Sequence, residues 1–110
     1  MIYGLPDHAV AKINGVFAQS PVIEKAVLYG SRAQGNYRNG SDIDLTLWGK
    51  ISFPALLNLH TALDDLLLPW TIDLSIYDRI ENPALQEHIR RVGKMFYEKE
   101  PLLLFSEDGR

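Results

Sequence analysis

The pattern of apolar and polar residues predicts two β-strands in the middle of the chain. Residues 42–48 and 71–77 each alternate between aliphatic and other side chains. Successive side chains of a strand point to opposite faces, so each segment would present one apolar face for packing and one more polar face. The aliphatic positions are Ile43, Leu45, Leu47, Ile72, Leu74 and Ile76.

Apolar residues at helical spacing predict three longer helices. The first opens at Pro6-Asp7 and ends at Ser20-Pro21, the second runs over 53–68 and is stopped by Pro69, and the third covers 84–92. Proline stops a helix because it lacks an N–H group and its ring clashes with the preceding turn. The expected inward-facing positions are Val10, Ile13, Phe17, Leu56, Leu59, Leu63 and Leu66.

Shorter segments complete the predicted fold. Residues 26–29 form an apolar run typical of a buried strand, and residues 95–97 are a candidate closing strand. Directly after residues 26–29, Gly30 begins a turn into a short helix, for which Ser31 is the expected N-terminal cap. This order of helices and strands predicts an α/β (α+β) fold, in which a small mixed β-sheet carries helices packed on one face.

Length and composition indicate one globular domain. The 110 residues suffice for a single domain, with a core at about 6–98 and a tail at 99–110. The absence of cysteine excludes disulfides, thiolate metal sites and cysteine nucleophiles. The apolar residues 101–105 could pack on the domain itself or on a partner, and the sequence leaves both open.

Charge and segment composition also limit the expected partners. A net charge of −3 without a basic stripe argues against a long nucleic acid as substrate. The N-terminus does not resemble a signal peptide, and no apolar run approaches the roughly 20 residues that span a bilayer. We therefore expect a cytoplasmic protein with no membrane partner.

Three aspartates lie in the predicted strands, although aspartate is depleted in strands. Asp42 and Asp44 are two residues apart, so they project from the same side of one strand, about 6–7 Å apart along the chain. Asp73 occupies the equivalent face of the other strand. If the two strands are neighbours, three carboxylates converge, and their repulsion requires protons or bound cations. Mg²⁺ is the usual cation beside phosphate groups.

A candidate phosphate-binding element precedes the aspartates. Gly30 lets the backbone approach a ligand closely, and the N–H groups at the start of the short helix favour an anion. Ser31 adds a hydroxyl donor, and Arg32 and Arg38 could add positive charge. The Gly30-Ser31 corner is therefore a candidate site for the β- and γ-phosphates of a nucleotide.

Together, the corner and the aspartates suit nucleotidyl transfer. Asp42 and Asp44 would hold two metal ions ~4 Å apart, the spacing that clamps attacking and leaving oxygens. Asp73 would complete the site of the metal that activates the acceptor hydroxyl, and could take its proton. Such catalysis rests mostly on positioning and charge neutralisation, which a small scaffold can supply.

These residues resemble the signature of the DNA polymerase β-type nucleotidyltransferase superfamily. In that signature, a Gly-Ser pair is followed by a spacer, an Asp-x-Asp motif and an acidic residue on a later strand. Gly30-Ser31, Asp42-Ile43-Asp44 and Asp73 match these positions. The fuller string over 29–45 looks like the minimal nucleotidyltransferase (MNT) branch, which often has arginine where this chain has Gln34.

The resemblance implies a fold like the palm domain of polymerase β and transfer of AMP from ATP with two Mg²⁺ ions. MNT proteins of this size commonly bind a small all-helical HEPN protein, and in several pairs the MNT antitoxin adds AMP to a tyrosine of a HEPN ribonuclease toxin. A hetero-oligomer with a HEPN partner is therefore implied here. The implied catalytic and metal-binding residues are Asp42, Asp44 and Asp73, and the implied nucleotide-binding residues are Gly30, Ser31 and Arg32.

Two hypotheses of different classes follow. The leading one is an enzyme that transfers AMP to a protein hydroxyl, with a small-molecule acceptor as a variant. The alternative is a non-catalytic binding module that neutralises or scaffolds a helical partner by contact. The leucine stripe over 56–67 is interpreted as core. The histidines are interpreted as non-catalytic, because they share no spacing; they are His8, His60 and His88.

Overall fold

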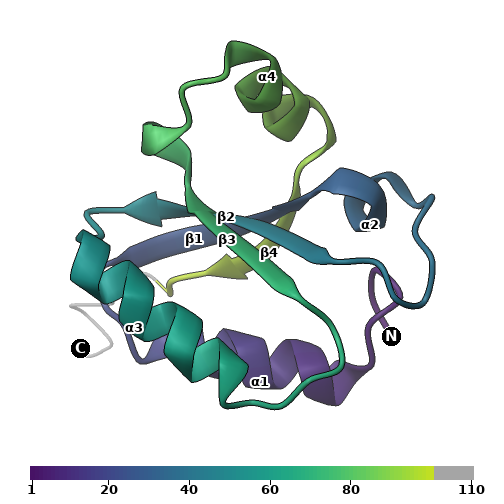
Figure 1. Ribbon diagram of the computed structural model, residues 1–110, viewed down its shortest axis with the longest axis horizontal. Coiled ribbons are helices and arrows are strands. Elements are labelled where there is room, and N and C mark those ends of the chain that lie inside the picture. Colours follow the sequence, from purple (N-terminus) through teal and green to yellow (C-terminus); the bar gives the residue numbers. More distant parts are fainter. Residues whose placement is uncertain (101–110) are drawn as a thin grey trace, which may run out of the picture.

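The computed structural model describes residues 1–100, so the apolar segment 101–105 lies outside the described residues. Figure 1 shows two layers of helices separated by one sheet. The predicted helices and strands are all present, and one short 3₁₀ helix, η1, is added. The elements are α1 (Asp7–Ala18), β1 (Ile23–Tyr29), α2 (Gly30–Gln34), β2 (Ile43–Gly49), α3 (Phe53–Asp64), β3 (Ile72–Ile76), η1 (Tyr77–Arg79), α4 (Pro83–Val92) and β4 (Lys94–Glu98).

The four strands form a single mixed sheet in the order β3-β2-β1-β4. Strand β1 pairs antiparallel with both β2 and β4, whereas β2 pairs parallel with β3. Parallel neighbours need a crossover connection, and α3 supplies it between β2 and β3. The predicted mixed sheet and fold class are thereby confirmed.

The main core lies between the sheet and the two helices α1 and α3. Ile13 and Phe17 of α1 are fully buried, and Leu59 and Leu63 of α3 are nearly so. The aliphatic positions of the alternating strands point to this face, as the period of two requires. The strand residues of this core are Ile23, Ala26, Leu28, Ile43, Leu45, Leu47, Leu74, Ile76 and Phe96.

Helix α4 lies on the opposite face of the sheet, away from α1 and α3 (Figure 1). There, Ile89 packs against Val27 and Tyr29 in a second apolar cluster, and Trp48 stacks on Tyr77 with ring centroids 4.4 Å apart. From the sequence, all helices were expected on one face of the sheet. The reason for the difference is the continuous apolar run of β1, which is typical of a strand that is covered on both sides.

Helix α3 ends earlier than the leucine pattern predicts, at Asp64 instead of residue 68. Turns at 63–67 follow, in which Leu67 has a positive φ of 56° and is 88% exposed. At the end of the leucine stripe the chain turns towards β3, and Leu66 and Leu68 still pack against the core while Leu67 points to solvent. Among residues 1–100, no helix is long and apolar enough to cross a membrane.

Candidate active site

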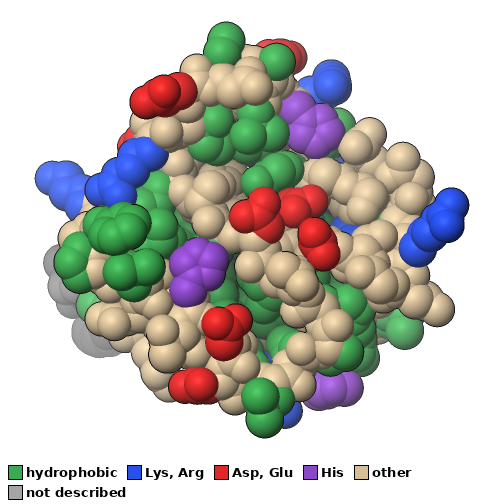
Figure 2. All heavy atoms as spheres, in the orientation of Figure 1, with side chains coloured by type: hydrophobic (Ala, Val, Ile, Leu, Met, Phe, Trp, Pro, Cys, Tyr) green, Lys and Arg blue, Asp and Glu red, His purple; other side chains and the backbone are tan. Residues whose placement is uncertain are grey.

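The three aspartates meet on the α4 side of the sheet. The parallel register of β2 and β3 places Asp44 directly beside Asp73, and the antiparallel register of β1 and β2 places Tyr29 on the other side of Asp44. Asp42 precedes Asp44 by two residues and acts on it electrostatically. Figure 2 shows a group of acidic side chains at the centre of the view. The condition set by the sequence, that the two strands be neighbours, is met.

Burial and like charges make the ionised form of Asp44 unfavourable. The side chain is half-buried, whereas Asp42 and Asp73 are exposed. Burial raises the pKa of Asp44, and the negative charges of Asp73 and Asp42 raise it further. A carboxylate in such surroundings is stabilised by a proton or by a bound cation.

The donor set fits a hard divalent cation. All of its donors are carboxylate oxygens, and Mg²⁺ is usually held by one or two carboxylates together with water and substrate phosphate oxygens. Within residues 1–100, no three His, Asp or Glu side chains already stand at the spacing of a closed metal site. The exposed carboxylates of Asp42 and Asp73 are free to turn towards an ion beside the half-buried Asp44.

The Gly30-Ser31 corner lies against Asp44. Gly30 has a φ of +74°, and a Cβ built on it would collide with the Asp44 Oδ2 atom. Only glycine therefore allows the backbone and the carboxylate to approach this closely. The prediction that Ser31 caps this helix is wrong. Helix α2 begins at Gly30, so its N-cap position is Tyr29.

Arg32 does not point at the corner, contrary to its expected role in nucleotide binding. Its side chain is buried, at 2% exposure, and its guanidinium donates to the backbone carbonyls of Ser41, Tyr3 and Asn39 at 2.9–3.2 Å. Four of the five guanidinium N–H donors can be used in this way. Arg32 therefore supports the loop that leads to Asp42.

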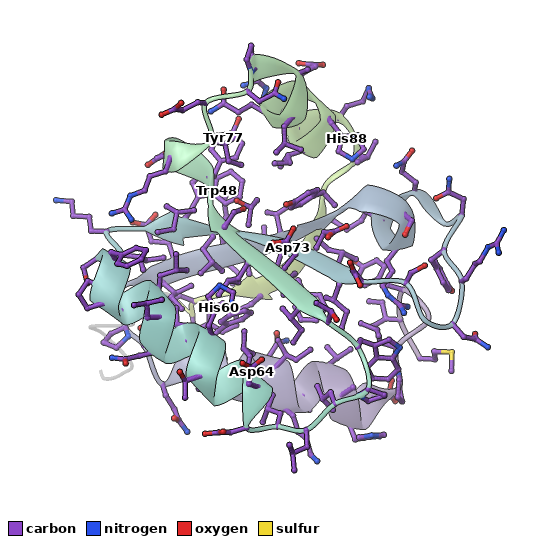
Figure 3. All side chains as sticks on the ribbon, in the orientation of Figure 1. Trp48, His60, Asp64, Asp73, Tyr77 and His88 are labelled. Atoms are coloured by element: carbon purple, nitrogen blue, oxygen red, sulfur yellow. The ribbon has the colours of Figure 1, made fainter. Side chains whose placement is uncertain are left out.

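His88 belongs to the site, which the sequence did not indicate. It extends from α4, and its Nε2 atom accepts a hydrogen bond from the Gly30 N–H at 3.3 Å. Its ring also meets Tyr29 edge to face, with centroids 6.2 Å apart. Figure 3 shows His88 on the same side of the sheet as Asp73, whereas His60 lies on α3. No periodicity or spacing marks His88, because only the packing of α4 brings it here.

The chain matches the family model described as polymerase beta, nucleotidyltransferase, over residues 11–102. It belongs to the polymerase β nucleotidyltransferase family. The match includes the Gly-Ser corner and all three aspartates, so the resemblance seen in the sequence is confirmed and the chain is a nucleotidyltransferase.

Similar proteins agree with this assignment. A proposed protein adenylyltransferase of Methanocaldococcus jannaschii is 27% identical over 82 residues, which cover 68% of this chain and 79% of the relative. A toxin–antitoxin crystal structure with AMP-PNP has a TM-score of 0.65 at 21% identity, covering 87% of this chain and 76% of that one. A complex of a tri-AMPylated Shewanella oneidensis HEPN toxin with MNT antitoxin has a TM-score of 0.61 at 19% identity, covering 84% and 71%.

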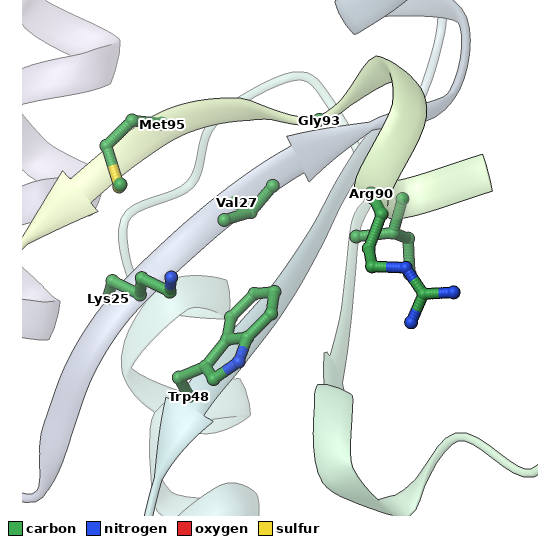
Figure 4. A pocket seen from close by; sticks show the side chains of 7 residues that line it. Lys25, Val27, Trp48, Arg90, Gly93 and Met95 are labelled. Atoms are coloured by element: carbon green, nitrogen blue, oxygen red, sulfur yellow. The ribbon is translucent and has the colours of Figure 1, made fainter. Parts of the chain in front are cut away.

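The nucleotidyltransferase has a separate pocket at the other end of the same sheet face. Its volume is about 370 Å³, and it opens between β1, β2 and the α4–β4 connection (Figure 4). None of its lining residues belongs to the aspartates or the corner, so we assign the chemistry to the Asp44 end. The lining residues are Lys25, Val27, Trp48, Ile89, Arg90, Gly93 and Met95.

Proposed function

We propose that this nucleotidyltransferase is a Mg²⁺-dependent enzyme that transfers AMP from ATP to a tyrosine hydroxyl of a HEPN partner protein. The observation that carries the proposal is the pairing of Asp44 with Asp73 beside Gly30. This pairing joins a candidate metal site to a candidate phosphate site at one point of the sheet.

Each group has a definite part in the proposed reaction. The acceptor oxygen attacks the α-phosphorus of ATP, the bond from that phosphorus to the β-phosphate oxygen breaks, and pyrophosphate leaves. In the Gly30-Ser31 corner, the Ser31 N–H and hydroxyl bind the β- and γ-phosphates, while the Gly30 N–H donates to His88. Asp73 would accept the proton of the acceptor hydroxyl. Asp42, Asp44 and Asp73 would hold the Mg²⁺ ions, which neutralise phosphate charge and help to ionise the acceptor when bound.

The choice of AMP, of a HEPN partner and of a protein acceptor draws on similar proteins. One relative carries the name of a protein adenylyltransferase, and solved complexes with this fold pair an MNT antitoxin with a HEPN toxin that is AMPylated in one case. The fold is the same, which supports a hetero-oligomer of the same kind for this chain. The cytoplasmic location expected from the sequence stays a prediction.

Intact-mass measurement of the partner tests the proposal. The chain is co-expressed with a candidate HEPN partner, purified as a complex, and incubated with ATP and Mg²⁺. We expect one or more AMP groups on the partner, lost when EDTA replaces Mg²⁺ and lost in an Asp42→Asn, Asp44→Asn double variant. Asp64→Asn is the matched control, because Asp64 is an exposed aspartate at the end of α3 and away from the site.

Two results would overturn the proposal. Equal partner masses with and without active chain, in the presence of ATP and Mg²⁺, would exclude AMP transfer. If the double variant also still neutralised the partner, the chain would be a binding module that acts by contact. Replacing the modified tyrosine of the partner by phenylalanine should abolish the added mass and so checks the acceptor.

A further inference from the structure

Gly30 is held from two sides by side chains of different elements. On one side, its Cα faces the Asp44 carboxylate of β2 so closely that a Cβ would not fit. On the other side, its N–H donates to the His88 Nε2 atom of α4. Figure 3 shows His88 reaching from α4 towards the β1–α2 corner.

The corner needs such a restraint because glycine restricts its own backbone so little. Gly30 adopts a φ of +74°, a region that glycine enters freely and also leaves freely. Rotation of the Tyr29–Gly30 peptide would turn the Gly30 N–H away from His88 and would shift the Ser31 N–H and hydroxyl that follow it relative to Asp44. A hydrogen bond to a group that is itself fixed opposes this rotation.

His88 is such a fixed group. Its neighbour Ile89 is 2% exposed and packs on Val27 and Tyr29, which anchors this turn of α4 to β1. The edge-to-face contact with the Tyr29 ring limits rotation of the imidazole. The acceptor atom therefore has a defined position above the corner.

We propose that His88 is a positioning residue of the nucleotidyltransferase, which holds the Gly30-Ser31 corner in the orientation that receives the triphosphate next to Asp44. The proposal rests on the proposed function, because it takes ATP as the nucleotide. His88 acts through Gly30 and need not touch the reacting atoms. Its contribution should consequently appear in nucleotide binding and not in recognition of the acceptor protein.

Two substitutions separate a positioning role from a structural one. His88→Leu removes the hydrogen-bond acceptor, whereas His88→Gln keeps an acceptor oxygen at a similar distance along the side chain. We expect His88→Leu to raise the KM for ATP by about two- to tenfold, the range for loss of one hydrogen bond. The KM for the partner protein should stay unchanged, and His88→Gln should recover at least half of the loss. His60→Leu is the matched control, because His60 is a half-buried histidine on α3, on the other side of the sheet.

A direct binding measurement distinguishes failure of this proposal from failure of AMP transfer. Titration calorimetry with Mg²⁺ and AMP-PNP should give a two- to tenfold weaker Kd for His88→Leu than for the wild-type complex or His60→Leu. This result would support His88 even if no partner were AMPylated. Wild-type affinity in a folded His88→Leu variant would overturn the proposal, and so would a loss that His88→Gln fails to relieve. Thermal unfolding of each variant shows whether it is folded.

Discussion

At the scale of single residues, Asp44 is the residue of the site whose negative charge is least favourable in the folded protein. It is half-buried, it lies between Asp42 and Asp73 in the charge cluster, and the Gly30 backbone is packed against its carboxylate. A group whose pKa is raised in the folded state takes up protons on folding. Stability is therefore lost as the pH rises from the ordinary aspartate pKa through the raised one. At neutral pH the ionised Asp44 should destabilise the protein unless a cation is bound.

Asp44→Asn should accordingly stabilise the metal-free protein while removing activity. We expect a higher Tm than wild type in EDTA at pH 7, and no gain below about pH 3, where the unfolded-state aspartate is also protonated. Adding Mg²⁺ should raise the Tm of the wild type more than that of the variant. AMP transfer should fall at least about 100-fold, because metal ligands contribute several kcal/mol to the transition state. A lower Tm for the variant in EDTA at pH 7 would contradict this account.

A pair of glycines tests whether close contact with Asp44 is what the corner needs. Gly30 and Gly35 both have positive φ, at +74° and +88°, so alanine costs about 1–2 kcal/mol of backbone strain at either position. Only at Gly30 would the new Cβ meet Asp44, since nothing lies within 4 Å at Gly35. We expect Gly30→Ala to lose about 100-fold in AMP transfer and Gly35→Ala to stay near wild type. Equal activities in the two folded variants would refute a special role for Gly30.

At the scale of elements, the loop between α2 and β2 depends on Arg32. The loop carries Asp42 into the site, and its carbonyls at Asn39 and Ser41 are bound by the buried guanidinium, which also reaches the carbonyl of Tyr3. Trp70 donates its indole N–H to the same Asn39 carbonyl. One side chain of α2 thus joins the N-terminal segment to the approach of β2.

Replacing this arginine should therefore affect stability first. We expect Arg32→Lys to lower the free energy of unfolding by about 2–3 kcal/mol, because lysine cannot reproduce the planar set of donors and leaves buried carbonyls without partners. Urea denaturation measures the loss, and exposed Arg38→Lys serves as the control. Unchanged stability together with weaker ATP binding would instead favour the phosphate contact that the sequence suggested for Arg32.

At the scale of the whole molecule, the two apolar clusters leave one part of the sheet open. Helices α1 and α3 pack on one face, and α4 packs on Val27 and Tyr29 of the other face, where Asp42 and Asp73 stay exposed. An open site on a domain of this size is compatible with a large acceptor. The net charge of −3 makes a protein acceptor more suitable than a polynucleotide.

Much of the fold and the site could be predicted because it depends on patterns formed by residues that are close together in the sequence. The period of two in β2 and β3 determines which side chains share a face, and therefore that Asp42, Asp44 and Asp73 avoid the core. The Gly-Ser pair and Asp-x-Asp motif likewise lie close together along the chain. These features identified the family, the elements and the residues proposed to carry the chemistry.

Contacts between distant segments were decided by the tertiary structure alone. Parallel pairing of β2 with β3 aligns Asp44 with Asp73, and packing of α4 on Val27 and Tyr29 brings His88 to Gly30. The Arg32 side chain points to the backbone carbonyls of Tyr3 and Ser41. These come together only when the N-terminal segment, α2 and the loop before β2 pack against one another. Which side chains become neighbours across the sheet depends on the burial of whole faces and on hydrogen bonds between distant segments. Local periodicity in the sequence carries information about neither.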